Sequence, residues 1–308
     1  MMSFEEFVEE IERIAELNGE KVIIHDVRKP GYQYKGIMLQ AKPGVGIPTA
    51  DLNRFYHEYT KDPDAECVAI ETAYKNIMSV LKNGMLMVGN ITDYAENKDK
   101  LIMKLIYAPG NREYLQDKVH NLLGDIAIVP CIMMNDNEDN CMSCAVTLNM
   151  LEMFGQDKET VLEDAIQSSM KNMPYVFLDM MALMEELSGQ DVNAENFDID
   201  NCTMFVLTNK KRLYGAACML YPGVFEEISY RTGCNLFVLP SSVHEVIIVR
   251  DDGQLRLEEL ESMVKDINVM CVKSEDKLAD HVLYYSREEG KLMLARNHEK
   301  ISLNKAAV

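Results

Sequence analysis

Two serines, a histidine and a glutamate stand within five positions of one another in the segment LPSSVHE, as Ser241, Ser242, His244 and Glu245. These residue types can supply a nucleophile, a general base and an orienting carboxylate. Ser242 and His244 are two residues apart, so in an extended strand their side chains lie on the same face and can touch. The segment is therefore the candidate centre of a hydrolase-like enzyme.

A second acid or base for such a site could come from Asp280 and His281. This requires the strand expected over residues 280–286 to lie beside the strand expected over 243–249. However, the chain has no Gly-X-Ser-X-Gly motif, and no glycine follows the two serines to help form an oxyanion hole. The hydrolase is therefore the alternative hypothesis rather than the main one.

The same segment has a simpler structural interpretation as the corner of an antiparallel hairpin. Pro240 fixes φ at the corner, and the hydroxyls of Ser241 and Ser242 can satisfy backbone groups of the turn. His244 then begins the return strand. A third interpretation makes this corner a binding surface, with the candidate residues Pro240, Ser241, Glu245 and Asp280.

The cysteines and histidines offer little support for a metal site. Cys141 and Cys144 have Cys-X-X-Cys spacing, but the segment is expected to be a strand, where residues three apart point to opposite faces. No second ligand pair follows at suitable spacing, and neither His57 nor His244 completes a His-Glu-X-X-His motif. Phosphate-binding glycine motifs are also missing, so the sequence predicts no metal and no cofactor.

The charge of the chain favours a protein partner over a nucleic acid. The 308 residues include 31 basic and 50 acidic side chains, for a net charge of −19, which excludes general electrostatic binding to nucleic acid. Residues 1–20 hold seven acids and one base, and residues 185–200 hold six acids and no base. A dense acidic face can imitate the phosphates of DNA and occupy a basic groove on another protein.

These features together favour a non-catalytic interaction or regulatory module with an acidic surface. One specific form of this hypothesis is a DNA-mimic inhibitor of a defence nuclease, and its partner would be a protein with a basic surface. The acidic, amphipathic start differs from a secretory signal, and no apolar run approaches the length of a membrane span. We therefore expect a cytoplasmic protein with no membrane association.

Hydrophobic periodicity predicts the elements that must position these residues. The expected helices cover 4–17 (with a Ser3–Glu6 capping box), 50–60, 65–82, 157–171, 174–187, 213–232 with an interruption at Pro222, and 255–267. The expected strands cover 21–29, 32–40, 84–91, 100–108, 124–134, 140–148, 203–208, 235–239, 243–249, 280–286 and 291–296.

This order of elements predicts an α+β fold with mixed, largely antiparallel sheets and flanking amphipathic helices. The link between the strands at 235–239 and 243–249 is too short for anything but an antiparallel pair. The polar and acidic stretch 188–201 has the composition of a linker. It divides the chain into a predicted N-terminal α+β domain over 1–187 and a C-terminal α+β domain over 202–308.

Several segments resemble an uncharacterised family. The segment YGAACMLYPGVFEEISYRTGCNLFVLPSSVHEVIIV, followed by LEELESMVKDIN and LADHVLYYSREEGKLML, resembles a cytoplasmic family of Gram-positive gut bacteria that is known as a domain of unknown function. LPSSVHEVIIV and LADHVLYY are its most specific parts and suggest an LPSSxHE signature. GDIAIVPCIMM and VLEDAIQSSMKNMP resemble the middle region of the same family. The resemblance implies a cytoplasmic α+β protein and assigns no catalytic residue.

Overall fold

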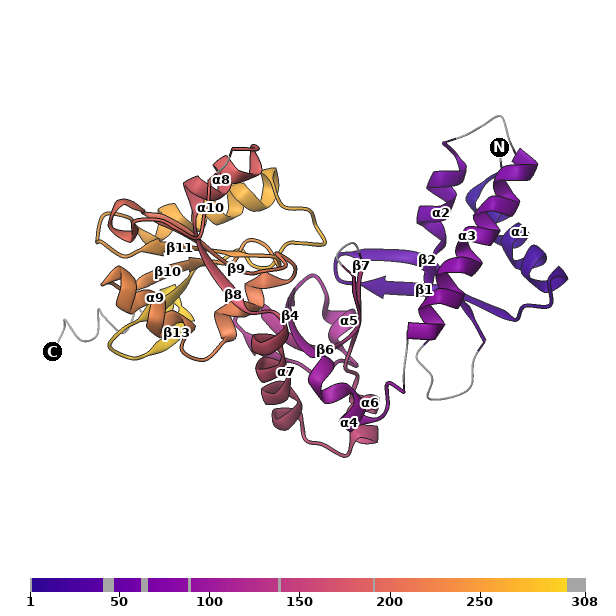
Figure 1. Cartoon of the computed structure of the whole chain (residues 1–308), viewed down its shortest axis with the longest axis horizontal. Coiled ribbons are helices and arrows are strands. Elements are labelled where there is room, and N and C mark those ends of the chain that lie inside the picture. The colour runs from indigo at the N-terminus through magenta and orange to yellow at the C-terminus, as the bar shows by residue number, and fades with distance from the viewer. Residues whose placement is uncertain are drawn as a thin grey trace.

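The computed structural model describes residues 2–40, 47–61, 66–87, 90–137, 140–190 and 192–297. The molecule is elongated, with an N-terminal unit at one end, a middle sheet, and a C-terminal sheet at the other end (Figure 1). Every strand pairing within the described residues is antiparallel. The structure thus confirms the predicted α+β class.

The N-terminal unit packs helices against a small sheet of strand order β1-β2-β3. Its core contains the buried side chains of Phe7, Ile11, Ile37, Ile77 and Leu81. The capping box predicted at Ser3 is present at the start of the first helix. The elements are α1 (Phe4–Leu17), β1 (Val22–Lys29), β2 (Tyr32–Leu39), β3 (Ala50–Asp51), α2 (Leu52–Tyr59) and α3 (Glu66–Met87).

The strand predicted over 84–91 is wrong in its first half, because α3 continues to Met87. Residues 88 and 89 lie outside the described residues. The helix predicted over 65–82 stops before Asn83 and Gly84, since glycine costs about 1 kcal/mol in a helix interior. Gly84 is buried instead against Pro48, and a Cβ at Gly84 would lie 2.7 Å from Pro48 Cβ, so this close contact takes the place of the helix end.

The middle unit is a sheet in which β6 lies between β4 and β5 and also pairs with β7. Helix α7 packs on β4, and the buried hydroxyl of Ser169 accepts a hydrogen bond from the Met103 amide at 2.7 Å. The elements are α4 (Tyr94–Asn97), η1 (Lys98–Lys100), β4 (Leu101–Tyr107), α5 (Arg112–Leu115), β5 (Asn121–Leu123), β6 (Ile126–Asn137), β7 (Asn140–Ala145), α6 (Leu148–Phe154) and α7 (Lys158–Asn172).

The C-terminal sheet has the strand order β13-β12-β10-β11-β9-β8 within the described residues. One face packs against α10, and the other faces η3, α9 and the middle unit. The elements are β8 (Tyr175–Asp179), α8 (Met180–Leu187), η2 (Ile199–Asn201), β9 (Met204–Asn209), η3 (Gly215–Leu220), α9 (Val224–Thr232), β10 (Leu236–Leu239), β11 (Val246–Arg250), α10 (Leu257–Met270), β12 (Leu283–Ser286) and β13 (Lys291–Leu294).

The segment 174–187 is not one helix as predicted, since its first residues form the edge strand β8. Its apolar run suits a buried strand as well as a helix, and pairing with β9 decides between them. The Asp179 carboxylate accepts a hydrogen bond from the Ala182 amide and so begins α8 directly after the strand. Residues 188–201, the predicted linker, therefore connect two paired strands of one sheet.

The middle unit and the C-terminal sheet share a hydrophobic core. Leu101 and Ile126 of the middle sheet belong to the same buried cluster as Phe205 and Leu236 of the C-terminal sheet. Among the described residues, the core of the N-terminal unit is separate, and its buried side chains lie between Phe7 and Leu81. No helix among the described residues has the length and apolar character needed to cross a lipid bilayer.

Candidate functional site

The LPSSVHE segment forms the connection between β10 and β11, which pair antiparallel as predicted. Strand β11 begins only at Val246, so Ser242 and His244 do not lie in it. The connection instead pairs with a distant loop. The Val243 amide donates to the Asp276 carbonyl at 2.8 Å, and the Leu278 amide donates to the Ser241 carbonyl at 3.0 Å.

The Ser242 hydroxyl takes part in its own turn. Ser242 is 6% exposed, and its Oγ accepts a hydrogen bond from the His244 amide at 3.0 Å. A serine nucleophile needs its hydroxyl within about 3.2 Å of a basic nitrogen. In the described part of the chain, Ser242 Oγ forms no hydrogen bond with the imidazole, so this geometry gives the hydrolase hypothesis no support.

Both ring nitrogens of His244 have other polar neighbours. Nδ1 accepts a hydrogen bond from the Tyr214 amide at 3.3 Å, and Nε2 lies 3.2 Å from Asp276 Oδ1. Since Nδ1 is an acceptor, the proton of the neutral ring sits on Nε2 and is donated to Asp276. The Tyr214 ring also stacks on the imidazole, with centroids 5.7 Å apart. This geometry therefore gives the general-base role of His244 no support.

Gly215 makes room for the contact between Thr208 and His244, and no motif in the sequence predicts this role of the glycine. The Thr208 hydroxyl donates to the His244 carbonyl at 2.8 Å, directly beside Gly215. A Cβ at Gly215 would lie 2.1 Å from Thr208 Oγ1 and 2.5 Å from the His244 carbonyl oxygen. The close approach of η3 to β9 therefore requires glycine here.

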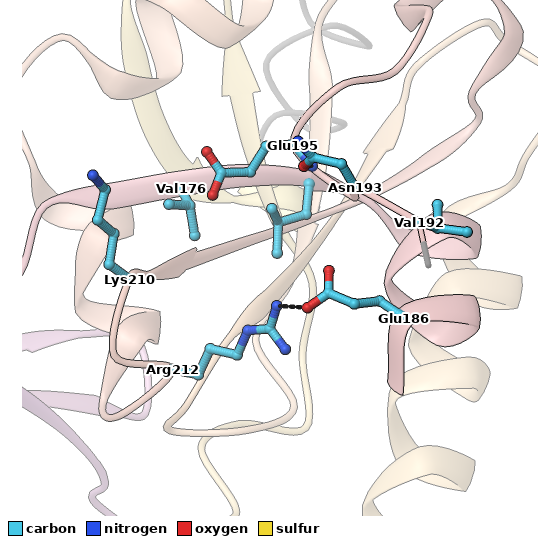
Figure 2. A pocket seen from close by; sticks show the side chains of 8 residues that line it. Val176, Glu186, Val192, Asn193, Glu195, Lys210 and Arg212 are labelled. Atoms are coloured by element: carbon cyan, nitrogen blue, oxygen red, sulfur yellow. Dashed lines mark hydrogen bonds and ion pairs between the residues drawn. The ribbon is translucent and has the colours of Figure 1, made fainter. Parts of the chain in front are cut away.

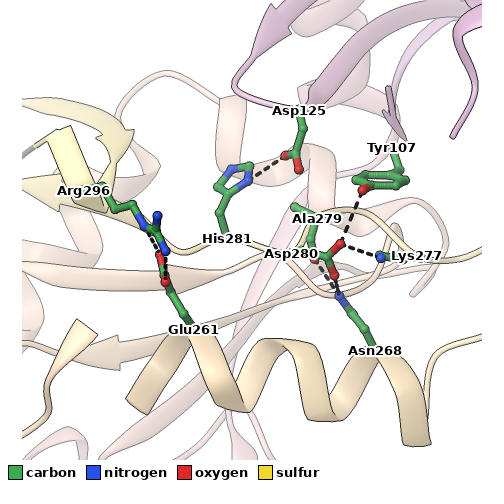
Figure 3. Close-up of polar contacts among 9 residues, drawn as sticks. All are labelled: Tyr107, Asp125, Glu261, Asn268, Lys277, Ala279, Asp280, His281 and Arg296. Atoms are coloured by element: carbon green, nitrogen blue, oxygen red, sulfur yellow. Dashed lines mark hydrogen bonds and ion pairs between the residues drawn. The ribbon is translucent and has the colours of Figure 1, made fainter. Parts of the chain in front are cut away.

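Asp280 and His281 do not join this group in the way the sequence predicted. The strand that follows them, β12, pairs with β10 and not with β11. His281 instead turns toward Asp125, in the turn between β5 and β6 (Figure 3). His281 Nδ1 lies 2.6 Å from Asp125 Oδ1, although the two atoms lack the alignment of a hydrogen bond.

The Asp280 carboxylate lies in a polar network of its own (Figure 3). It accepts hydrogen bonds from Lys277 Nζ at 2.6 Å, Asn268 Nδ2 at 2.9 Å and the Tyr107 hydroxyl at 3.3 Å. Burial acts to raise its pKa, but the hydrogen bonds from Lys277 and Asn268 and the charge of Lys277 bring that pKa below the ordinary value. A carboxylate that is ionised and shared by three donors ties the middle sheet to α10 and the loop before β12.

The candidate binding residues at the corner offer little surface. Pro240 and Ser241 are buried, and Glu245 is half-buried. The described residues instead form clefts elsewhere. One of about 480 Å³ lies between β8, α8 and residues 192–195 (Figure 2). Another, of about 540 Å³, is lined by residues from 28–33 and 109–114.

Helix α8, at the rim of the first cleft, exposes large apolar side chains. Met181, Met184 and Leu187 are 65%, 61% and 70% exposed. Ala182 and Leu183 of the same helix pack on the sheet. We call these three residues, the exposed Glu185 of the same helix and the exposed Glu195 in the lining of the first cleft the α8 surface. Glu186, on the same helix, is paired with Arg212 at 2.7 Å (Figure 2).

The Cys-X-X-Cys segment forms strand β7, as predicted. Burial raises the pKa of the Cys144 thiol, the opposite of what a reactive cysteine needs. The Cys141 side chain lies outside the described positions. Among the side chains that the structure describes, no group of three or more His, Cys, Asp or Glu residues could hold a metal ion.

A comparison with known protein families matches one family to residues 3–287, which is nearly the whole chain. The chain belongs to the DUF5688 family, a family of unknown function. DUF5688 membership confirms the expected resemblance to a domain of unknown function. The expected source in Gram-positive gut bacteria and the LPSSxHE signature stay predictions. No curated protein and no solved structure matches the chain.

Proposed function

We propose that this protein is a non-catalytic interaction module that binds an apolar and basic segment of another protein on the α8 surface. The observation that carries the proposal is the exposure of Met181, Met184 and Leu187 on one short helix. Contiguous exposed apolar side chains with a polar rim are typical of protein-binding sites. Methionine is frequent at such sites, because its flexible thioether adapts to the partner.

Charge complementarity determines the kind of partner. Glu185 and Glu195, the two acids of the α8 surface, are exposed. Arg212 compensates Glu186, and Lys210 stands across the neighbouring cleft. The remaining acids favour a segment that carries lysine or arginine beside apolar residues, such as a basic amphipathic helix.

The position of the acids favours local docking over mimicry of DNA. An imitation of an extended phosphate array needs a continuous acidic face. The acids of residues 5–20 lie on and just after α1, whereas Glu185 lies on α8, and these two helices are at opposite ends of the molecule (Figure 1). The proposed partner therefore contacts the α8 surface alone, as a basic segment rather than a long groove.

The experiment compares capture of partners by variants of the full chain. Met181→Ser with Met184→Ser removes the apolar side chains of the α8 surface without changing charge. The matched control, Leu148→Ser with Met153→Ser, alters side chains of α6 that are 49% and 53% exposed. Extracts of the native cell are passed over each protein at low and moderate salt, and affinity for the captured protein is then measured.

The expected result is a captured protein with a basic segment, bound more weakly as salt rises. The α8 variant should bind it at least about tenfold more weakly, while the α6 variant binds it like wild type. Equal binding by the two variants would refute the proposal. So would a captured protein whose affinity does not depend on salt.

A further inference from the structure

We infer that the cleft between residues 28–33 and 109–114 binds a small polyphosphate group. We call it the hairpin cleft, because its first wall is the tip of the β1–β2 hairpin. Its volume of about 540 Å³ lies within the range of sites for small molecules. It is separate from the α8 surface, so the inference does not depend on the proposed function.

The charge of the hairpin cleft is opposite to that of the whole chain. Its lining includes Arg28, Lys29 and Arg112, against the single acid Glu113. Glu113 is paired with Arg28. In the described residues, Lys29 and Arg112 form no ion pair, although the chain has 50 acidic and only 31 basic side chains. Two cations thus remain available on opposite walls.

The surroundings of Lys29 favour the arrival of an anion. Desolvation lowers its pKa, Asp51 acts in the opposite sense, and the like charge of Lys104 lowers the pKa further. Lys104 stands 3.5 Å above the ring of Tyr214, which carries no compensating charge. A bound anion would offset the repulsion between these two lysines.

Contacts at the hairpin tip hold the two walls at a fixed separation. The Gly31 amide donates to Asn111 Oδ1 at 3.0 Å. Gly31 has a left-handed φ of 67°, and a Cβ there would lie 2.7 Å from the Glu275 Cα. The tip is therefore packed against the middle unit and against the loop before β12. Lys29 and Arg112 are presented from two units, an arrangement that suits a ligand with more than one anionic group.

Aromatic side chains complete the lining and favour a phosphate ester of a ring compound. Tyr32 and Tyr114 both line the cleft. The Tyr32 hydroxyl donates to Asp51 Oδ2 at 2.7 Å, and its ring stacks on Tyr34 with centroids 5.4 Å apart. These two contacts hold the Tyr32 ring beside Lys29 and Arg112, where a planar group of the ligand can stack on it.

The test measures binding of sodium pyrophosphate and of ATP to the full chain by calorimetry at low salt. Lys29→Gln and Arg112→Gln each remove one cation of the cleft. Lys100→Gln removes an exposed lysine outside it and is the matched control. Because Lys29 and Arg112 are exposed, each variant is expected to keep its fold, which circular dichroism checks.

We expect pyrophosphate and ATP to bind wild type and Lys100→Gln alike. Lys29→Gln and Arg112→Gln should each raise the Kd at least about tenfold. The inference fails if pyrophosphate does not bind at millimolar concentration, or if the control loses as much affinity as the cleft variants. Citrate binding as tightly as pyrophosphate would overturn the assignment to polyphosphate.

Discussion

His244 is held on both sides of its ring, by the Tyr214 amide at Nδ1 and by Asp276 at Nε2. Its carbonyl accepts the Thr208 hydroxyl, in the narrow space that Gly215 leaves open. A residue type that usually suggests proton transfer thus fastens the β10–β11 connection to β9, to the start of η3 and to the loop before β12. A tight fit of this kind makes the local structure sensitive to a single added methyl group.

Gly215→Ala should lower the free energy of unfolding by about 1 to 3 kcal/mol or more, because the new Cβ would overlap Thr208 and the His244 backbone. Thermal and urea unfolding measure the loss. Gly110→Ala is the control, since its Cβ would approach no closer than 3.3 Å to the Tyr107 ring. Equal stability of the two variants would show that the contacts around Gly215 are not tight.

Among the elements, α10 covers one face of the C-terminal sheet and also fixes the chain after β13. It buries Leu260 and Val264, and its Glu261 accepts a hydrogen bond from Arg296 Nε at 2.6 Å (Figure 3). The Glu261 side chain is 9% exposed and that of Arg296 is 69% exposed. The hydrogen bonds from Arg296 lower the pKa of Glu261, and burial opposes this shift only in part.

Glu261→Gln should lower the free energy of unfolding by about 1 to 2 kcal/mol at neutral pH, less than for a fully buried pair because Arg296 is largely solvated. The folded pKa lies below the ordinary value of 4.5. The stabilisation is therefore complete above pH 4.5 and is lost as pH falls through the folded pKa. Urea unfolding at a series of pH values should show the difference from wild type shrinking in acid.

The control for this pH series is Glu258→Gln, which changes an exposed glutamate of the same helix. It should leave the pH profile of unfolding close to that of wild type. A Glu261→Gln profile parallel to wild type down to strongly acidic pH would contradict the assigned ion pair.

For the whole molecule, the division of the cores suggests how the chain folds. Residues up to position 81 form one core, whereas the middle unit and the C-terminal sheet share another. The segment 188–201 lies inside the shared part, between the paired strands β8 and β9. We therefore propose that the independent folding units meet near residue 88, and that a division at 188–201 would expose part of a core.

A fragment of residues 90–308 should fold alone and unfold cooperatively, since it keeps the shared core intact. A fragment of residues 202–308 should not, because Phe205 and Leu236 lose their neighbours from the middle unit, and β9 loses β8. Circular dichroism during heating distinguishes the outcomes. A cooperative transition in the shorter fragment would support the boundary predicted at 188–201.

Local signals in the sequence were enough for much of the fold. The Ser3–Glu6 capping box marks α1, and the short link after Leu239 requires the antiparallel β10–β11 pair. The apolar run of β8 was predicted as part of a helix. A short buried strand and a turn of a buried helix have the same apolar pattern, so the sequence alone does not distinguish them. Gly84 did not end the helix, because it lies in close contact with Pro48, which is distant in the sequence.

The sequence by itself determined the fold class, the charge and the residues that could do chemistry. Only the tertiary structure decided their neighbours: Asp276 and Tyr214 at His244, Asp125 at His281, and exposure of the methionines of α8. Backbone propensity and periodicity act over a few residues. The partners of a side chain depend on how elements distant in the chain pack, which no local pattern encodes.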